Sequence, residues 1–175
     1  NVAGTVDNEG EIVGLTGLGI GGSAEPTAVS NSGRIQGTSD YGIHNGGSGT
    51  VTITNEADGV IEGAKSGIFA QEGAIVLDNA GTIIGHGTYD GLAAEPDSGV
   101  TIAVGPSRVT NSGTITGAGA GISTSHYYDA ATDSLKPLAA GTEIINSGTI
   151  TGQSNDGVRL IGGGTVTNSG TIEGL

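Results

Sequence analysis

Aliphatic residues recur along the chain at short intervals, and polar or small residues lie between them. In the segment "GTVTITN" (49–55), apolar and polar residues alternate, which is typical of a short strand with one buried face. Aligning the repeats gives three aliphatic columns. The first is Val6, Val29, Ile53, Leu77, Val109, Ile144 and Val166; the second is Ile12, Ile35, Ile61, Ile83, Ile115, Ile150 and Ile172; the third is Ile20, Ile43, Ile68, Leu92, Ile122 and Val158. Each repeat therefore predicts three short strands.

An Asn residue anchors each repeat within the pattern V-x-N-x-G-x-I-x-G. Copies include "VSNSGRIQG" (29–37), "VTNSGTITG" (109–117) and "VTNSGTIEG" (166–174), and "ITNEADGVIEG" (53–63) is two residues longer. The anchors are Asn8, Asn31, Asn55, Asn79, Asn111, Asn146 and Asn168. They are separated by 23, 24, 24, 32, 35 and 22 residues, so the basic unit has 22–24 residues and two copies are enlarged.

A single repeat has too little apolar surface to form its own core, so the copies must stack on one another. The sequence therefore predicts an all-β fold, a right-handed parallel β-helix (β-solenoid) of about seven coils with three strands per coil. Stacked at the usual strand spacing of ~4.8 Å, the coils would form one domain over 1–175. At the corners we expect Asn, which tolerates the left-handed conformation and can form a hydrogen-bonded ladder, and Gly with positive φ.

The composition supports a narrow core and excludes several kinds of function. The chain has 36 Gly, four Tyr, one Phe and no Met or Trp, so the large side chains of a thick core are missing. Because no Cys is present, disulfides, thiolate metal sites and Cys nucleophiles are excluded. The net charge of −13 argues against nucleic acid or anionic lipid as a partner, since both require Lys and Arg. No apolar run approaches the ~20 residues of a membrane span.

Two insertions enlarge consecutive repeats, at about 93–108 and 123–143. Counted from the third column, both fall at the same point of their coils, so we expect them to lie side by side as one protrusion. Insertions in solenoids often gather on the binding face. The candidate contact residues are Asp97, Arg108, His126, Tyr127, Tyr128, Asp129, Asp133 and Lys136. Paired Tyr beside carboxylates can stack on a sugar face and accept hydroxyl hydrogen bonds, although tyrosines that only cover the coil below are an open alternative.

No motif for catalysis, metal or cofactor binding stands out. "GLGIGG" (17–22) matches a dinucleotide-binding pattern, but no βαβ unit follows it, so we interpret it as a Gly-rich corner. His44, His86 and His126 are single residues in separate coils without metal-ligand spacing. We expect no catalytic residue, metal or cofactor. A polysaccharide-degrading β-helix is the enzymatic alternative, and its candidates are Asp90, Asp97, Asp129, Asp133, Arg108 and Lys136, provided that the two insertions fold together.

Serial "N-S-G-T-I-T-G" units with "D-G-I/V" turns resemble the β-helical passenger domains of bacterial autotransporters and related secreted adhesins. The resemblance covers essentially the whole chain and identifies no site. It implies export to the bacterial cell surface and roles in adhesion, aggregation or surface display. Because both ends of the chain lie within a repeat, we expect either a fragment of a longer passenger or end-to-end stacking of copies.

Two main hypotheses of function follow. The first is a non-enzymatic, extracellular adhesin segment, a rigid stalk whose loops contact a host or bacterial surface glycan or protein. The second is a structural subunit that stacks with copies of itself into an extracellular filament or surface layer. Neither involves nucleic acid or direct insertion of this segment into a membrane.

Overall fold

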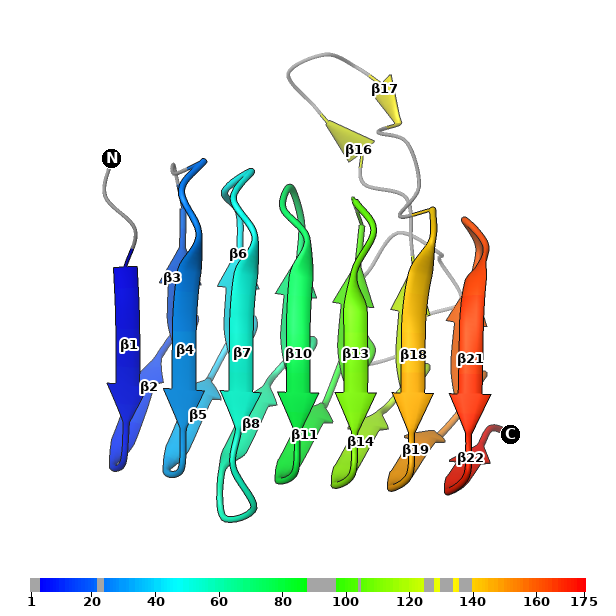
Figure 1. The fold of residues 1–175 in the computed structure, drawn as a ribbon. Coiled ribbons are helices and arrows are strands. Elements are labelled where there is room, and N and C mark those ends of the chain that lie inside the picture. Colours follow the sequence, from blue (N-terminus) through cyan, green and yellow to red (C-terminus); the bar gives the residue numbers. More distant parts are fainter. Residues whose placement is uncertain are drawn as a thin grey trace.

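The computed structural model describes residues 4–21, 24–87, 97–103, 105–124, 128–129, 134–135 and 140–175. This part of the chain winds as a right-handed parallel β-helix, whose coils lie side by side along one axis (Figure 1). Two seven-stranded sheets and one six-stranded sheet form its faces, and the described residues contain no helix. The predicted all-β solenoid with about seven coils and three strands per coil is confirmed.

We name the sheets A, B and C in the order in which each coil enters them. Sheet A consists of β1 (Gly4–Asn8), β4 (Thr27–Asn31), β7 (Val51–Asn55), β10 (Ile75–Asn79), β13 (Arg108–Asn111), β18 (Thr142–Asn146) and β21 (Gly164–Asn168). Sheet B consists of β2 (Glu11–Gly14), β5 (Arg34–Gly37), β8 (Val60–Gly63), β11 (Thr82–Gly85), β14 (Thr114–Gly117), β19 (Thr149–Gly152) and β22 (Thr171–Glu173). Sheet C consists of β3 (Leu18–Ile20), β6 (Ile43–Asn45), β9 (Ile68–Ala70), β12 (Val100–Ile102), β15 (Ile122–Thr124) and β20 (Val158–Leu160).

The core is a stack of identical positions from successive coils. The first predicted column lies in sheet A and the second in sheet B, and both are paired in register over all seven coils. In coils two to six these side chains are at most 2 % exposed. Burying one such aliphatic side chain contributes about 1.5–3 kcal/mol to the free energy of unfolding. Because the coils on either side provide this burial, each coil gains stability chiefly from its neighbours. Both columns are confirmed.

The third column is partly wrong. Ile43 pairs with Leu18, not with Ile20, because the connection from sheet B to sheet C has three residues (15–17) in the first coil and five (38–42) in the second. In the fourth coil, Val100 rather than Leu92 pairs with Ile68 on one side and Ile122 on the other. A constant offset from the Gly therefore fails wherever the length of this connection changes.

The second insertion lies within its predicted range, whereas the first lies elsewhere than predicted. In the fourth coil the extra residues precede β12 and lengthen the connection from sheet B to sheet C, residues 86–99. In the fifth coil they follow β15 and lengthen the connection from sheet C to sheet A, residues 125–141, which contains a hairpin of β16 (Tyr128–Asp129) and β17 (Ser134–Leu135). Residues 100–102 and 108, assigned to the first insertion from the sequence, belong to strands of sheets C and A. The two insertions thus leave the coil at different corners.

The seven Asn anchors form a continuous ladder along the corner between sheets A and B. Each Asn ends a strand of sheet A, and its Nδ2 donates to the Oδ1 of the next Asn at 2.7–2.8 Å, from Asn8 to Asn168. The same Nδ2 also lies within hydrogen-bonding distance of backbone carbonyls, for example Gly81 O (3.2 Å) and Thr114 O (3.3 Å) for Asn79. The Asn side-chain amide thereby has hydrogen-bond partners in every coil, as buried polar groups require.

Glycine at these corners is required for close approach rather than for positive φ. Among the described glycines only Gly105, Gly141 and Gly163 have positive φ, and all three lie in connections from sheet C to sheet A. At the Asn corner, a Cβ on Gly113 would overlap the carbonyl oxygen of Gly81 in the coil before. The positive φ expected of glycine at the corners other than the Asn corner is therefore found at three glycines between sheets C and A, whereas at the Asn corner the stacking distance between coils explains the glycines.

Candidate functional site

The structure separates the two predicted contact residues whose side chains it describes. Asp97 lies in the connection from β11 to β12, where its carbonyl accepts a hydrogen bond from Gly119 N at 3.0 Å and its carboxylate lies against Gly119. Arg108 begins β13 on the outer face of sheet A, with Nε 3.7 Å from Glu143 Oε2 of the next coil. One residue belongs to a corner and the other to a sheet face.

The remaining predicted contact residues lie in the second insertion. Tyr128 and Asp129 form β16 and pair in antiparallel fashion with Leu135 and Ser134. His126, Tyr127, Asp133 and Lys136 lie outside the described residues, so their part in a contact surface stays a prediction. The lyase alternative required both insertions to fold together. The two insertions leave the coil at different corners, and Asp90, Asp133 and Lys136 lie outside the described residues, so this alternative stays a prediction.

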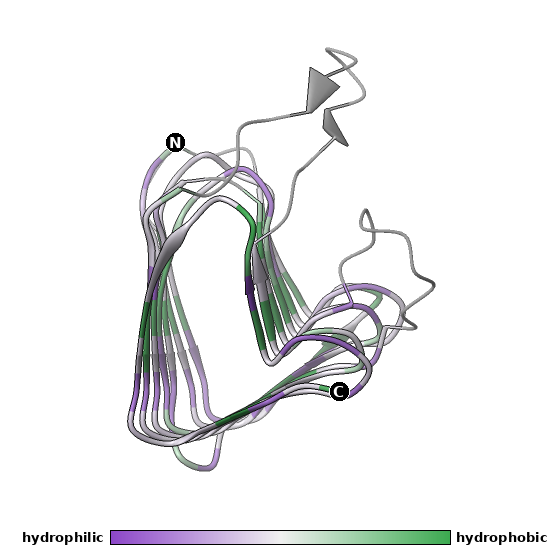
Figure 2. Ribbon diagram, turned by 90° about the vertical axis from the view of Figure 1, so that its right-hand side faces the viewer, coloured by the Kyte–Doolittle hydropathy of each residue, from purple (hydrophilic) through white to green (hydrophobic). Residues whose placement is uncertain are grey.

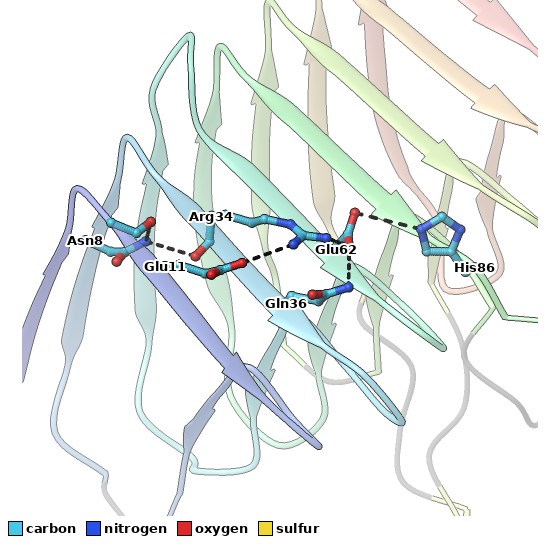
Figure 3. Close-up of polar contacts among 7 residues, drawn as sticks. Asn8, Glu11, Arg34, Gln36, Glu62 and His86 are labelled. Atoms are coloured by element: carbon cyan, nitrogen blue, oxygen red, sulfur yellow. Dashed lines mark hydrogen bonds and ion pairs between the residues drawn. The ribbon is translucent and has the colours of Figure 1, made fainter.

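A charged network crosses four coils on the outer face of sheet B (Figure 3). Arg34 contacts Glu62 and lies 3.1 Å from Glu11 through its second terminal nitrogen, Nη1. Gln36 Nε2 donates to Glu62 Oε1 at 2.7 Å, and His86 Nε2 lies 4.0 Å from Glu62 Oε2. The hydrogen bond with Glu62 raises the pKa of the Arg34 guanidinium.

This network is built to hold coils together. Its members come from successive coils, and Glu62, at 15 % side-chain exposure, accepts from both Arg34 and Gln36. The carboxylate of Glu62 therefore has hydrogen-bond partners within the protein and is not directed at a ligand. The network joins successive coils, although each ion pair at the surface contributes little to the free energy of unfolding. We therefore interpret the network as a structural link between coils, not as a catalytic centre.

An aromatic cluster lies on the outer face of sheet C, in the second and third coils. His44 and Phe69 occupy the middle position of β6 and β9 and pair in register. Their rings are stacked, with centroids 5.4 Å apart and planes inclined by 5°. Tyr41, in the connection before β6, contacts both rings at centroid distances of 5.0 Å and 4.8 Å. We call these three residues the aromatic platform.

Polar side chains surround the aromatic platform. His44 Nε2 lies 2.6 Å from Gln71 Oε1, a hydrogen bond that orients the imidazole. Lys65 Nζ lies 5.7 Å from the centre of the Tyr41 ring and 3.0 Å from Asp40 Oδ1. Aromatic rings beside amide, carboxylate and ammonium groups combine an apolar surface with directional hydrogen bonding.

The sequence interpretation missed this cluster. It treated His44 as a single residue, although His44 and Phe69 each follow directly on a residue of the third column, Ile43 and Ile68. Residues at the same place in consecutive repeats face the same way, so the aligned repeats contain the signal for the stacked pair. The contribution of Tyr41 was not visible, because it comes from a turn.

Within the described residues, no group of three or more His, Asp or Glu side chains is placed to hold a metal ion. The described part of the chain also has no helix long and apolar enough to cross a membrane.

Comparison with known proteins gives no relative: no protein-family model, no curated protein and no solved structure matches the chain.

Proposed function

We propose that this protein is the rigid stalk of an extracellular, surface-displayed adhesin that presents contact surfaces and performs no chemistry. The observation that supports the proposal is the unbroken axial bonding of the coils. Seven Asn side chains and two seven-stranded sheets run the full length of the β-helix. At ~4.8 Å per coil, the β-helix is a stiff element about 30 Å long, which is suited to holding a contact surface away from the cell surface.

The surface chemistry is consistent with a binding role. The net charge of −13 favours solubility and discourages edge pairing of a repetitive β protein. Glu11, Arg34 and Glu62 of sheet B are paired with one another, as are Arg108 and Glu143 on sheet A. Only two connections between strands are much longer than their equivalents in other coils. Binding residues often lie on loops that a rigid scaffold holds in place.

The test is attachment of beads coated with the purified protein to cultured epithelial cells and to bacterial cells. We expect attachment that soluble protein inhibits. A variant in which residues 125–141 are replaced by the three residues of the equivalent connection, 161–163, tests the second insertion as a contact surface. We expect this variant to attach at least tenfold less at equal coating density, with an unchanged circular dichroism spectrum.

Two results would contradict the proposal. Failure of the wild-type beads to attach to any of the cells would remove the adhesin function itself. Release of shortened sugars from a panel of polysaccharides would show an enzyme in place of a stalk. Attachment that survives the loop replacement would move the contact surface away from residues 125–141.

A further inference from the structure

The aromatic platform occupies part of a single row on the outer face of sheet C. The middle residue of every strand in this sheet points away from the core, and the register gives the row Gly19, His44, Phe69, Thr101, Ser123 and Arg159. Phe69, Thr101 and Ser123 are nevertheless buried, so the exposed part of the row in the first coils is at Gly19 and His44. Two aromatic rings therefore stand next to a position without a side chain. Figure 2 shows that the connections from sheet B to sheet C project outward beside this face, and Tyr41 lies on one of them.

Among the described residues, nothing fills the position beside His44 on the side of the first coil. One face of the imidazole stacks on Phe69, so its opposite face is turned toward the first coil, where the paired residue is Gly19. A Cβ built on Gly19 would meet no atom within 4 Å. Neighbouring strands are ~4.8 Å apart, which is close to the distance at which a saturated ring stacks on an aromatic one. The row thus leaves space for one more ring on the stack.

The surrounding groups indicate which ring fits. Asp40 lies in the same coil as His44, and Gln71 and Lys65 reach toward this coil from the third one, as their contacts with His44 and Asp40 show. Hydroxyls at the rim of the stack would therefore meet both acceptors and donors. The charge of Lys65 is balanced by Asp40 at 3.0 Å, and the whole chain carries a charge of −13. With the charge of Lys65 neutralised, the negative charge of the whole chain repels an acidic sugar.

We propose that the aromatic platform and the open position over Gly19 form a binding subsite for a neutral pyranose ring of a glycan. The apolar face of the sugar stacks on His44, and its hydroxyls bond to the polar side chains at the rim. Phe69 stacks on the opposite face of the imidazole, and Tyr41 contacts both rings. The inference rests on the proposed adhesin function for its biological setting, while the binding itself is measurable on the purified protein.

The decisive variant fills the open position and removes nothing. Gly19→Leu places a branched side chain where the sugar would lie, and the backbone at Gly19 has no positive φ that would oppose it. Gly10→Leu is the matched control, because a Cβ at Gly10 also meets no atom within 4 Å but lies at the corner between sheets A and B. His44→Thr removes the stacking surface and keeps a residue that the same row already contains at Thr101.

The experiment is saturation-transfer NMR and isothermal titration with chitotetraose, mannotetraose and maltohexaose, and with trigalacturonate as the acidic probe. We expect saturable binding of at least one neutral probe, a Kd at least tenfold higher for Gly19→Leu and His44→Thr, and wild-type affinity for Gly10→Leu. Circular dichroism and the urea midpoint of each variant establish that it is folded.

Three outcomes would overturn the inference: no saturable binding of any neutral probe, unchanged affinity of Gly19→Leu, or tighter binding of trigalacturonate. The two proposals fail separately. If beads attach to cells and Gly19→Leu beads attach equally well with no glycan bound, the adhesin function stands and the subsite is wrong. If a neutral probe binds and Gly19→Leu blocks it but no beads attach, the subsite stands and the adhesin function is wrong.

Discussion

Asn55 Nδ2 donates to Asn79 Oδ1 at 2.8 Å, and the two residues, 24 positions apart in the chain, occupy the same place in neighbouring coils. Asn55 is fully buried and also accepts from Asn31, so its side chain links three coils. The amide ladder is therefore a second axial support beside the three sheets.

Asn55→Ala should destabilise the fold markedly. The substitution removes the acceptor of Asn31 Nδ2 and the donor to Asn79 Oδ1, both in a buried corner. Asn79 Oδ1 would be left without its donor, while Asn31 Nδ2 would keep only the carbonyls of Gly33 and Val60. An unpaired buried polar group costs about 1–3 kcal/mol and the lost hydrogen bond from Asn31 adds to this cost, so we expect a loss of roughly 2–4 kcal/mol in the free energy of unfolding. Urea denaturation measures it. Asn168→Ala, at the exposed end of the ladder, is the control and should lose less than half as much.

Gly113→Ala should be costly for a different reason. The added methyl would overlap the carbonyl of Gly81, and the backbone of the neighbouring coil cannot retreat without breaking the sheet register. Overpacking of this kind costs about 1–3 kcal/mol or more. Gly10→Ala, at the same place after the Asn of the first coil, meets no atom within 4 Å and should be nearly neutral. Equal urea midpoints for the two variants would contradict the close-approach role of the repeat glycines.

Because side chains alternate between the core and the surface along a strand, substitutions at adjacent residues should change the free energy of unfolding by very different amounts. Ile115 is fully buried in β14, whereas Thr116 points away from the core. We expect Ile115→Ala to cost about 2–5 kcal/mol through lost burial and a residual cavity. Thr116→Ala should stay within about 0.5 kcal/mol of the wild type, as surface substitutions usually do. Thermal and urea unfolding of both variants would check this, and comparable losses would contradict the assigned register.

The repeat itself was predictable because each coil uses the same residues for the same purpose. The Asn anchors and the first two aliphatic columns are separated by constant distances within a coil, apart from the two extra residues before Val60, so their register follows from the sequence. The register of the third column was not predictable, because the connection that precedes it varies from three residues in the first coil to fourteen (86–99) in the fourth. An offset that changes from coil to coil cannot be recovered from hydrophobicity alone, and Leu92 and Val100 both fit the pattern.

The candidate site was less predictable than the fold. Searching for sites where the repeat is interrupted led to the insertions, whereas the aromatic platform lies on regular strands of the second and third coils. The pairing of His44 with Phe69 follows from repeat alignment, but the approach of Tyr41 depends on the path of a turn. Turn conformation reflects local backbone geometry that the spacing of aliphatic residues does not encode.

The ion pairs of Arg34 on sheet B should respond to salt and hardly to pH near neutrality. A raised pKa of Arg34 means that its pairing stabilises the folded state fully below the unfolded-state pKa and is lost only as the pH rises through the folded-state pKa. Arg34→Gln should therefore lower the thermal midpoint by a similar amount at pH 6, 8 and 10. The difference should shrink in 1 M NaCl, where the screening length falls to about 3 Å. Because Arg34 is 41 % exposed, we expect a small shift, and a large, salt-independent one would show that Arg34 acts through packing instead of charge.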